Sequence, residues 1–245
     1  MIDQDLIGWR ARIGLIVPDS LIPTEPWFNR VKPKGVSFLT TRMSFGKKTT
    51  PETLKKMKEH VLRGARELAN SEVDVIGFCC TSGSFIEGVG YDKKIAQEIE
   101  QEVAIPATTT TSSFLEALNL LKIKSLILIT PYIMEINRIE KDFLEKMNFS
   151  VVEIGTLNKI DVIDYTNTTA GEIYRLAKNT FKKNSSVGGI FISCMSMRAM
   201  DVIDCLEMDL EVPVVTSDQA TLWKLLRLAG VKEKIKGYGK LLYEY

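Results

Sequence analysis

The chain has 245 residues, of which 45% are hydrophobic and 26% charged, and 32 basic against 31 acidic residues leave a formal net charge of +1. Such a balance gives no electrostatic footprint for a polyanion, so we expect no nucleic-acid partner. The longest apolar runs, such as residues 125–129, are far shorter than the roughly 18–20 residues of a membrane span, and the acidic residues 1–5 lack a signal-peptide pattern. These features predict a cytoplasmic protein that does not enter a membrane.

Short apolar runs typical of β-strands alternate along the chain with longer runs of helical spacing. In the expected helix 51–69, for example, apolar residues recur at the spacing of one helix face. The expected strands are residues 12–17, 36–41, 73–78, a short strand opened by 105–106, and then 125–130, 151–154, 188–193 and 212–216. The expected helices are residues 51–69, 92–103, 113–121, 134–147, 171–181, 198–208 and 219–228. This alternation predicts parallel sheets covered on both faces by helices.

The chain also repeats itself. Residues 13–18 match 126–131, residues 73–80 match 187–194, and residues 105–109 match 212–216, at offsets of 113, 114 and 107 residues. Any two strand–helix–strand stretches look partly alike, but three landmarks in one order favour an internal duplication. We therefore expect an α/β fold of two pseudo-symmetric lobes, each a parallel sheet flanked by helices, with the active site in the cleft between them.

The expected lobe boundaries follow from the repeat. The first lobe is predicted to span residues 1–112 and to be completed by the C-terminal segment 217–245, and the second lobe to span residues 113–216.

Four cysteines in a cytoplasmic chain predict free thiols, and two of them occupy equivalent places in the repeat. Cys80 and Cys194 each follow a predicted strand, at the sheet edge where α/β proteins bind ligands. Nearby helix starts favour a thiolate, and one thiolate facing one thiol can move a proton across a carbon. Cys79 and Cys205 are expected to be buried structural residues, Cys205 on an apolar helix face.

Other cofactor or metal signals are weak. The chain has no Cys-x-x-Cys pair, a single histidine (His60), no dinucleotide-binding fingerprint and no phosphate loop. We therefore expect neither a metal nor a cofactor.

Hydroxyl groups cluster around the two cysteines. Thr81 and Ser82 follow Cys80 at a predicted helix start and could bind an anion, and Ser196 takes the corresponding place in the second lobe. Residues 108–113 with 216–217 either line the floor of the cleft or only cap helices. Tyr132 points either into the cleft or into the core. The polar segment 157–169 is either a lid or a surface loop.

These residues resemble the aspartate/glutamate racemase superfamily, within it the maleate isomerase and arylmalonate decarboxylase branch. The resemblance covers nearly the whole chain and rests on the motifs IGLIVP (13–18), FCCTSGSF (78–85), TPY (130–132), ISC (192–194), VPVV (212–215) and GYGKLL (237–242). It implies two pseudo-symmetric lobes and cofactor-free chemistry on a small carboxylate. It also implies a substrate pocket built from Pro18 with its loop, Thr81, Ser82, Tyr132 and the N–H of Met195.

The chain departs from each branch member. Arylmalonate decarboxylase has glycine at the position of Cys80, and maleate isomerases usually read Pro-Ser-Ser-Asn where this chain has Pro18-Asp19-Ser20-Leu21. The amino-acid racemases usually show Cys-Asn-Thr where this chain has Cys80-Thr81-Ser82. Maleate itself and α-amino acids are therefore less favoured as substrates.

Three functional readings remain from the sequence. The first is a cofactor-independent isomerase or racemase of a small carboxylate, with Cys80 as thiolate and Cys194 as proton donor. The second is a decarboxylase of a malonate-type acid that uses Cys194 alone. The third is a non-catalytic carboxylate-binding protein, in which Cys80 and Cys194 would alkylate no faster than Cys205. The expected partners are a small carboxylate and, in a homo-oligomer, further copies of the chain.

Overall fold

Two parallel four-stranded sheets form the framework of the computed structural model, which describes residues 7–245 except for the side chain of Lys58. The acidic residues 1–5 and the start of the predicted first lobe lie outside the described residues. The first sheet has the order β2 (Val36–Met43), β1 (Ala11–Pro18), β3 (Val75–Phe78), β4 (Ala107–Thr109). The second has the order β6 (Ser150–Lys159), β5 (Ser125–Tyr132), β7 (Gly189–Ile192), β8 (Val214–Thr216).

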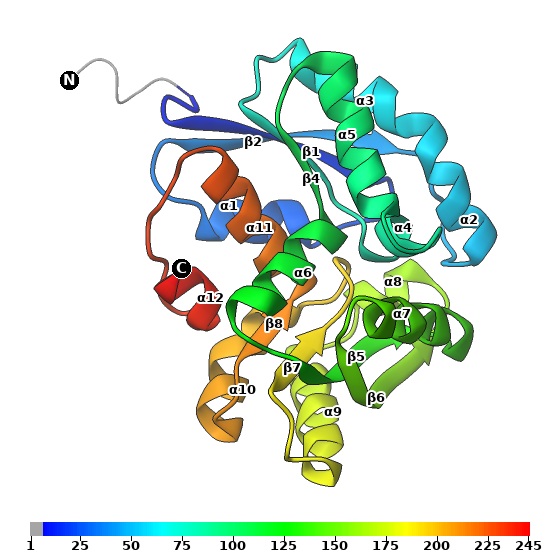
Figure 1. The fold of residues 1–245 in the computed structure, drawn as a ribbon. Helices are drawn as coiled ribbons and strands as arrows, with labels where there is room; N and C mark the ends of the chain where they lie inside the picture. Colours follow the sequence, from blue (N-terminus) through cyan, green and yellow to red (C-terminus); the bar gives the residue numbers. More distant parts are fainter. Residues whose placement is uncertain (1–6) are drawn as a thin grey trace.

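The two sheets have the same strand order, and Figure 1 shows them as two separate layers of the molecule. Within each sheet every neighbouring pair of strands is parallel. The predicted α/β fold of two pseudo-symmetric lobes, each a parallel sheet flanked by helices, is thereby confirmed. The exact lobe boundary, at residue 112, stays a prediction.

Helices cover both faces of the sheets. They are α1 (Thr24–Val31), α2 (Pro51–Lys56), α3 (Val61–Ala69), α4 (Thr81–Phe85), α5 (Tyr91–Val103), α6 (Thr110–Leu120), α7 (Met134–Lys146), α8 (Val162–Thr166), α9 (Ala170–Lys183), α10 (Ile203–Leu210), α11 (Ser217–Leu228) and α12 (Gly239–Glu244). Two short 3₁₀ segments, Met57–His60 and Ala199–Val202, interrupt the helices expected at 51–69 and 198–208.

Local sequence explains several helix starts. Thr50, Thr169 and Thr216 each close a capping box, in which the threonine hydroxyl accepts the N–H three residues on while that residue's side chain accepts the N–H of the threonine. Three short helices, α1, α8 and α12, were not expected from the sequence, and of α4 only the start after Cys80 was. Each has eight residues or fewer, which is too short for an apolar period to be recognised.

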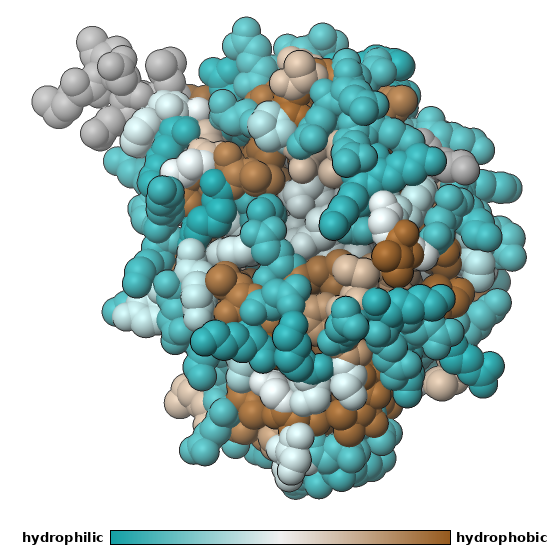
Figure 2. Space-filling model, in the orientation of Figure 1, coloured by the Kyte–Doolittle hydropathy of each residue, from teal (hydrophilic) through white to brown (hydrophobic). Residues whose placement is uncertain are grey.

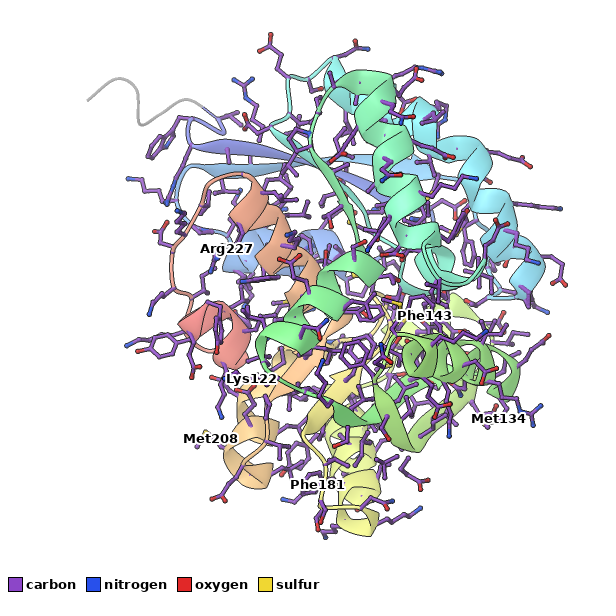
Figure 3. The ribbon with its side chains drawn as sticks, in the orientation of Figure 1. Lys122, Met134, Phe143, Phe181, Met208 and Arg227 are labelled. Carbon is purple, nitrogen blue, oxygen red and sulfur yellow. The ribbon has the colours of Figure 1, made fainter. Side chains whose placement is uncertain are left out.

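Helices α6 and α11 lie side by side between the two sheets (Figure 1). Helix α6 contacts β4 of the first sheet and β8 of the second, and α11 contacts β3 and β8. Aromatic pairs strengthen the junction: Phe114 of α6 packs on Phe191 of β7 with ring centroids 4.4 Å apart. Phe143 of α7 lies against α4, where it stacks on Phe85 at 5.7 Å (Figure 3). The lobes therefore share one continuous apolar core.

The surface is mainly hydrophilic. Figure 2 shows a face dominated by polar and charged residues, with hydrophobic residues in separate patches. Within residues 7–245, none of the helices combines the length and the apolar character that a bilayer crossing requires.

The junction gives a first prediction. Phe114→Ala is expected to lower the free energy of unfolding by about 3–5 kcal/mol, because it removes a fully buried ring from the packed core. Urea unfolding measures the change. Phe181→Ala is the matched control, since that ring is only partly buried at the outer end of α9. Equal losses in the two variants would contradict the importance of the α6 junction.

Candidate active site

A small pocket with about 340 Å³ of empty space, its open mouth included, lies between the lobes. It is reached by loops at the carboxyl ends of strands in both sheets, which is where open α/β sheets bind ligands. The lining residues are Pro18, Ser20, Leu21, Phe45, Thr49, Cys79, Cys80, Thr81, Ser82, Tyr132, Val162, Tyr165, Cys194, Met195 and Ser196.

All seven residues that the sequence singled out for the site line this cavity: Pro18, Cys80, Thr81, Ser82, Tyr132, Cys194 and Met195. The structure thus brings them together, although their roles in chemistry stay predictions. Cys80 and Cys194 each stand two residues beyond the third strand of their sheet, since β3 ends at Phe78 and β7 at Ile192. One thiol of each lobe therefore reaches the same cavity.

Cys80 is the N-cap of α4. Its backbone is extended and its sulfur accepts a hydrogen bond from the N–H of Gly83 at 3.4 Å. The sulfur also lies 3.9 Å from the thioether sulfur of Met57. A glycine is needed at position 83, because a Cβ there would come within 2.9 Å of the Cys80 sulfur. The start of α4 thus fixes the first thiol.

Cys194 adopts a different conformation. Its φ of 130° lies in the region that L-residues rarely occupy, a strain that survives only where surrounding contacts impose it. Its N–H donates to the hydroxyl of Ser217 at 3.0 Å, and its sulfur accepts the N–H of Ser196 at 3.3 Å. Tyr132 also hydrogen-bonds to the sulfur.

A single hydroxyl links the two cysteine loops. Ser217 Oγ accepts the N–H of Cys194 and, at 2.9 Å, the hydroxyl hydrogen of Thr81, the residue after Cys80. Ser217 is the first residue of α11 and is completely buried. The Thr81 side chain is therefore engaged, so Thr81 and Ser82 would offer a carboxylate chiefly the N–H groups at the start of α4, which have no partner within the helix.

Burial changes the acid–base properties of both thiols. It raises the pKa of Cys80 to about 11, although the N–H of Gly83 and the side chain of Ser82 act in the opposite direction. Burial likewise raises the pKa of Cys194 to about 12, against hydrogen bonds from Tyr132 and Ser196. The expectation that helix starts would lower these pKa values is wrong, because the loss of solvation outweighs a few backbone hydrogen bonds.

The other two cysteines differ from each other. Cys79 is completely buried, as predicted, and its thiol hydrogen points to the carbonyl of Gly77 at 3.5 Å. Cys205 is exposed, so the prediction of an apolar helix face is wrong. Helix α10 starts only at Ile203, and it buries Ile203 and Leu206 while Cys205 falls on the opposite side. Cys205 would therefore react with an alkylating reagent faster than Cys80 and Cys194, whether or not those two are catalytic. A comparison of alkylation rates with Cys205 thus does not distinguish an enzyme from a binding protein.

Several lining residues were missed from the sequence. Phe45 and Thr49 follow β2, while Val162 and Tyr165 belong to α8 in the segment 157–169. Backbone hydrogen bonds join these two segments across the lobes, from Thr49 N to Ile160 O at 3.1 Å and from Val162 N to Lys47 O at 2.9 Å. The segment 157–169 thus completes β6, forms α8 and closes one side of the cavity. No local pattern reveals such a long-range pairing.

The hydroxyl run at residues 108–113 lies behind the cavity instead of lining it. Thr109 is the N-cap of α6, and Thr216 is the N-cap of α11, in agreement with the alternative prediction that these residues cap helices. Thr111 bonds to Ser84 at 2.7 Å and Thr110 to Thr221 at 3.2 Å, so these hydroxyls join α4, α6 and α11 beneath the site.

Two buried carboxyl groups flank the Cys194 loop. Glu140 of α7 accepts a hydrogen bond from Ser193 at 2.5 Å, and burial raises its pKa to about 8. Asp218 of α11 accepts one from Thr24 at 3.2 Å, and burial raises its pKa well above the usual range. The second oxygen of each carboxyl group has no hydrogen-bond partner in the described part of the chain. In the described part of the chain, no three His, Cys, Asp or Glu side chains gather in a way that could hold a metal ion.

Comparisons with known proteins place this geometry in context. Residues 13–242 match the model of the family described as arylmalonate decarboxylase. The chain is 28% identical to arylmalonate decarboxylase of Bordetella bronchiseptica, over 95% of this chain and 96% of that protein. It is 24% identical to maleate isomerase of Pseudomonas putida, over 94% and 96%.

A solved structure has the same fold. It is a cysteine-to-serine variant of the maleate cis-trans isomerase of Nocardia farcinica that carries a covalently bound succinylcysteine intermediate. It superimposes with a TM-score of 0.89 at 21% identity, over 96% of this chain and 98% of that one.

The raised thiol pKa values predict how the cavity reacts with iodoacetamide. The alkylation rate of Cys80 should climb about tenfold per pH unit from pH 7 to 10, because the thiolate is the nucleophile and its fraction grows in that proportion below the pKa. Mass spectrometry of tryptic peptides follows each cysteine, with exposed Cys205 as the internal reference that reacts first at pH 7. A Cys80 rate that levels off below pH 9 would show that burial does not control this thiol.

Glu140 predicts a pH dependence of stability. Its pKa is higher in the folded chain than the ordinary 4.5, so the folded state holds a proton that the unfolded state has lost between about pH 4.5 and 8. Its contribution to stability is complete below pH 4.5 and falls as pH rises, by about 1.4 kcal/mol per pH unit. In Glu140→Gln, urea unfolding at pH 5 to 9 should show a shallower decline than in the wild type. Glu135→Gln, exposed on the same helix, is the control and should keep the wild-type slope.

Proposed function

Because the chain belongs to the arylmalonate decarboxylase family, we propose that it is a cofactor-independent isomerase or racemase that acts on a small carboxylate through Cys80 and Cys194. The observation that carries this proposal is the placement of one thiol from each lobe on the same small cavity. A decarboxylase needs a proton donor on one side only. Two thiols at equivalent positions of two lobes suit chemistry on both sides of one carbon.

The proposed reaction starts from the thiolate of Cys80. In racemisation, this thiolate removes the α-proton, and the thiol of Cys194 donates its proton to the other side. The roles of the two sulfurs are then exchanged, and the next turnover can run in the opposite direction. In cis–trans isomerisation, the Cys80 thiolate adds to one carbon of the double bond while the Cys194 thiol donates its proton to the other carbon. The resulting single bond rotates, the Cys194 thiolate takes that proton back, and the carbon–sulfur bond breaks to form the trans double bond and the Cys80 thiolate. The cysteine-linked intermediate of the Nocardia farcinica enzyme supports this second course.

The substrate carboxylate is proposed to bind at the N–H groups of Thr81, Ser82 and Met195, with Tyr132 and Pro18 shaping the cavity beside them. Charge that develops on the carboxylate as the α-carbon loses its proton would be stabilised by these fixed donors. The cavity contains no side chain with a full charge among its lining residues, so the donors act in a medium of low polarity.

A second candidate is a decarboxylase of a malonate-type acid with Cys194 as the only proton donor. The specific observation in its favour is the 28% identity to an arylmalonate decarboxylase, which exceeds the 24% to the maleate isomerase. A binding protein without chemistry is the weakest of the three readings, since the named relatives are enzymes. Homo-oligomerisation and a cytoplasmic location stay predictions.

Substitution of the cysteines tests the proposal. Purified protein is incubated in deuterated buffer with maleate, arylmalonates, 2-substituted succinates and aspartate, and proton NMR follows isomerisation, α-hydrogen exchange and loss of a carboxyl group. On the acid that reacts, Cys80→Ser and Cys194→Ser should each lower turnover by on the order of 10³-fold, because each thiol has its own step. Cys205→Ser is the control and should retain wild-type turnover. If Cys80→Ser keeps full activity and the substrate loses a carboxyl group, the protein is a decarboxylase instead.

A further inference from the structure

Hydrogen bonds hold the backbone of the Cys194 loop on both sides of its strained residue. Before the strained φ angle, the N–H of Cys194 donates to Ser217 Oγ at 3.0 Å. Beyond it, the peptide group that joins Met195 to Ser196 is engaged at both ends. Its N–H donates to the sulfur of Cys194 at 3.3 Å, and its carbonyl oxygen lies 3.4 Å from the hydroxyl of Thr24. Thr24 therefore sets the direction of an N–H group that reaches the sulfur.

Thr24 is the first residue of α1 and is almost completely buried. Its hydroxyl oxygen lies not only 3.4 Å from the carbonyl of Met195 but also 3.2 Å from Oδ1 of Asp218. A hydroxyl group has one hydrogen, so it can donate fully to only one of these oxygens. If Asp218 is ionised, two acceptors compete for that hydrogen. If Asp218 is a neutral acid, it donates to Thr24, Thr24 donates to Met195, and each contact has a hydrogen of its own.

The surroundings of Asp218 favour the neutral acid. Its side chain is completely buried, and Oδ2 has no hydrogen-bond partner in the described part of the chain. Burial raises the pKa of Asp218 well above the usual range, against hydrogen bonds from Thr24 and from its own N–H. A negative charge here would also face two buried thiols, because ionised Asp218 raises the pKa of Cys79 and that of Cys194. A buried carboxylate without a cation beside it is costly, whereas a neutral acid is not.

We propose that Asp218 is a neutral acid that positions the sulfur of Cys194 through a chain of hydrogen bonds. The chain runs from the carboxyl hydrogen of Asp218 to Thr24, from the Thr24 hydroxyl to the carbonyl of Met195, and from the N–H of that same peptide group to the sulfur. Hydrogen bonds in such a chain polarise one another, so the last N–H becomes a better donor to a thiolate. Asp218 is a positioning residue, because it keeps its proton and does not touch the substrate.

The effect of this chain on turnover rests on the proposed function, because it assumes that Cys194 exchanges a proton with the substrate. The effect on the thiol itself does not. Without the Thr24 hydroxyl, the Ser196 N–H would be aimed less well at the sulfur, and the thiolate of Cys194 would be less stable. The chain can therefore be tested on the thiol alone, without a substrate.

Alkylation by iodoacetamide at a fixed alkaline pH, followed by mass spectrometry of tryptic peptides, measures the reactivity of each thiol. Thr24→Val keeps the size of the side chain but removes the hydroxyl, so alkylation of Cys194 should slow on the order of tenfold while that of Cys80 stays unchanged. Thr24→Ser should restore the rate. Thr41→Val is the matched control, since Thr41 is a buried threonine that donates to the carboxylate of Glu67 and does not line the cavity.

Substitution of Asp218 tests its protonation state. Asp218→Ala should slow the alkylation of Cys194 by about threefold, because Thr24 loses the donor that keeps its own hydrogen on Met195. Asp218→Asn should restore the wild-type rate, since the amide N–H donates to Thr24 in place of the acid hydrogen. If Asp218 were ionised, Asp218→Asn would instead remove a negative charge beside the thiol, lower the pKa of Cys194 and speed its alkylation. That result would overturn the neutral acid.

Turnover of the acid that reacts links the chain to the proposed function. In Thr24→Val, kcat should fall on the order of tenfold with KM unchanged, because the chain acts on a sulfur and not on substrate binding. If Thr24→Val changes Cys194 and Cys80 equally or not at all, the chain is wrong and the proposed function stands. If alkylation of Cys194 slows but kcat does not fall, the chain stands and the proposed role of Cys194 is wrong. Thermal unfolding verifies that Thr24→Val is folded, and Thr24→Ala replaces it if it is not.

Discussion

The site depends on one hydroxyl group, that of Ser217, which accepts hydrogen bonds from both cysteine loops. The two thiols come from different sheets, so nothing in either sheet alone determines the distance between them. Ser217 sits on α11, between the sheets, and receives the N–H of Cys194 directly and the hydroxyl of Thr81 beside Cys80. Because all three groups are buried, each hydrogen bond that is lost leaves a polar group without water to replace its partner. The relative position of the thiols is thereby tied to the packing of α11.

The burial of both thiols sets the chemistry that the cavity can perform. A raised pKa makes a thiolate rare at neutral pH, yet the same thiolate is a stronger base once it forms. The α-hydrogen of a carboxylate is only weakly acidic, so a strong base is what its removal requires. Burial raises the pKa of both thiols, so either sulfur is a strong base once it has lost its proton. Burial therefore lowers the fraction of thiolate at neutral pH but makes each thiolate a stronger base.

Much of the fold was accessible from the sequence, because strands buried on both faces read as continuous apolar runs and the repeat marked equivalent positions in the two lobes. The equivalent positions of Cys80 and Cys194 in the two lobes followed from the nearly constant offset between the repeated segments of the sequence. Features that arise from contacts between distant segments were not accessible. Thr49 and Val162 meet only because the lobes are joined. Helix α10 turns Ile203 and Leu206 to the core, which leaves Cys205 on its exposed side. The sequence-based expectation of lowered thiol pKa values was wrong, because the burial of each thiol depends on how both lobes pack around it.

The sharing of the cavity by two similar lobes has a consequence for how such a chain can change over evolutionary time. A duplicated unit normally leaves one copy free to drift while the other keeps its task. Here each copy supplies one thiol to a single compartment, and the backbone of each holds a loop of the other through the Thr49–Ile160 and Val162–Lys47 hydrogen bonds. Neither half can be released from selection, because a substitution in one reshapes the space seen by the other. New substrate preferences would therefore arise through paired changes in both halves of the sequence.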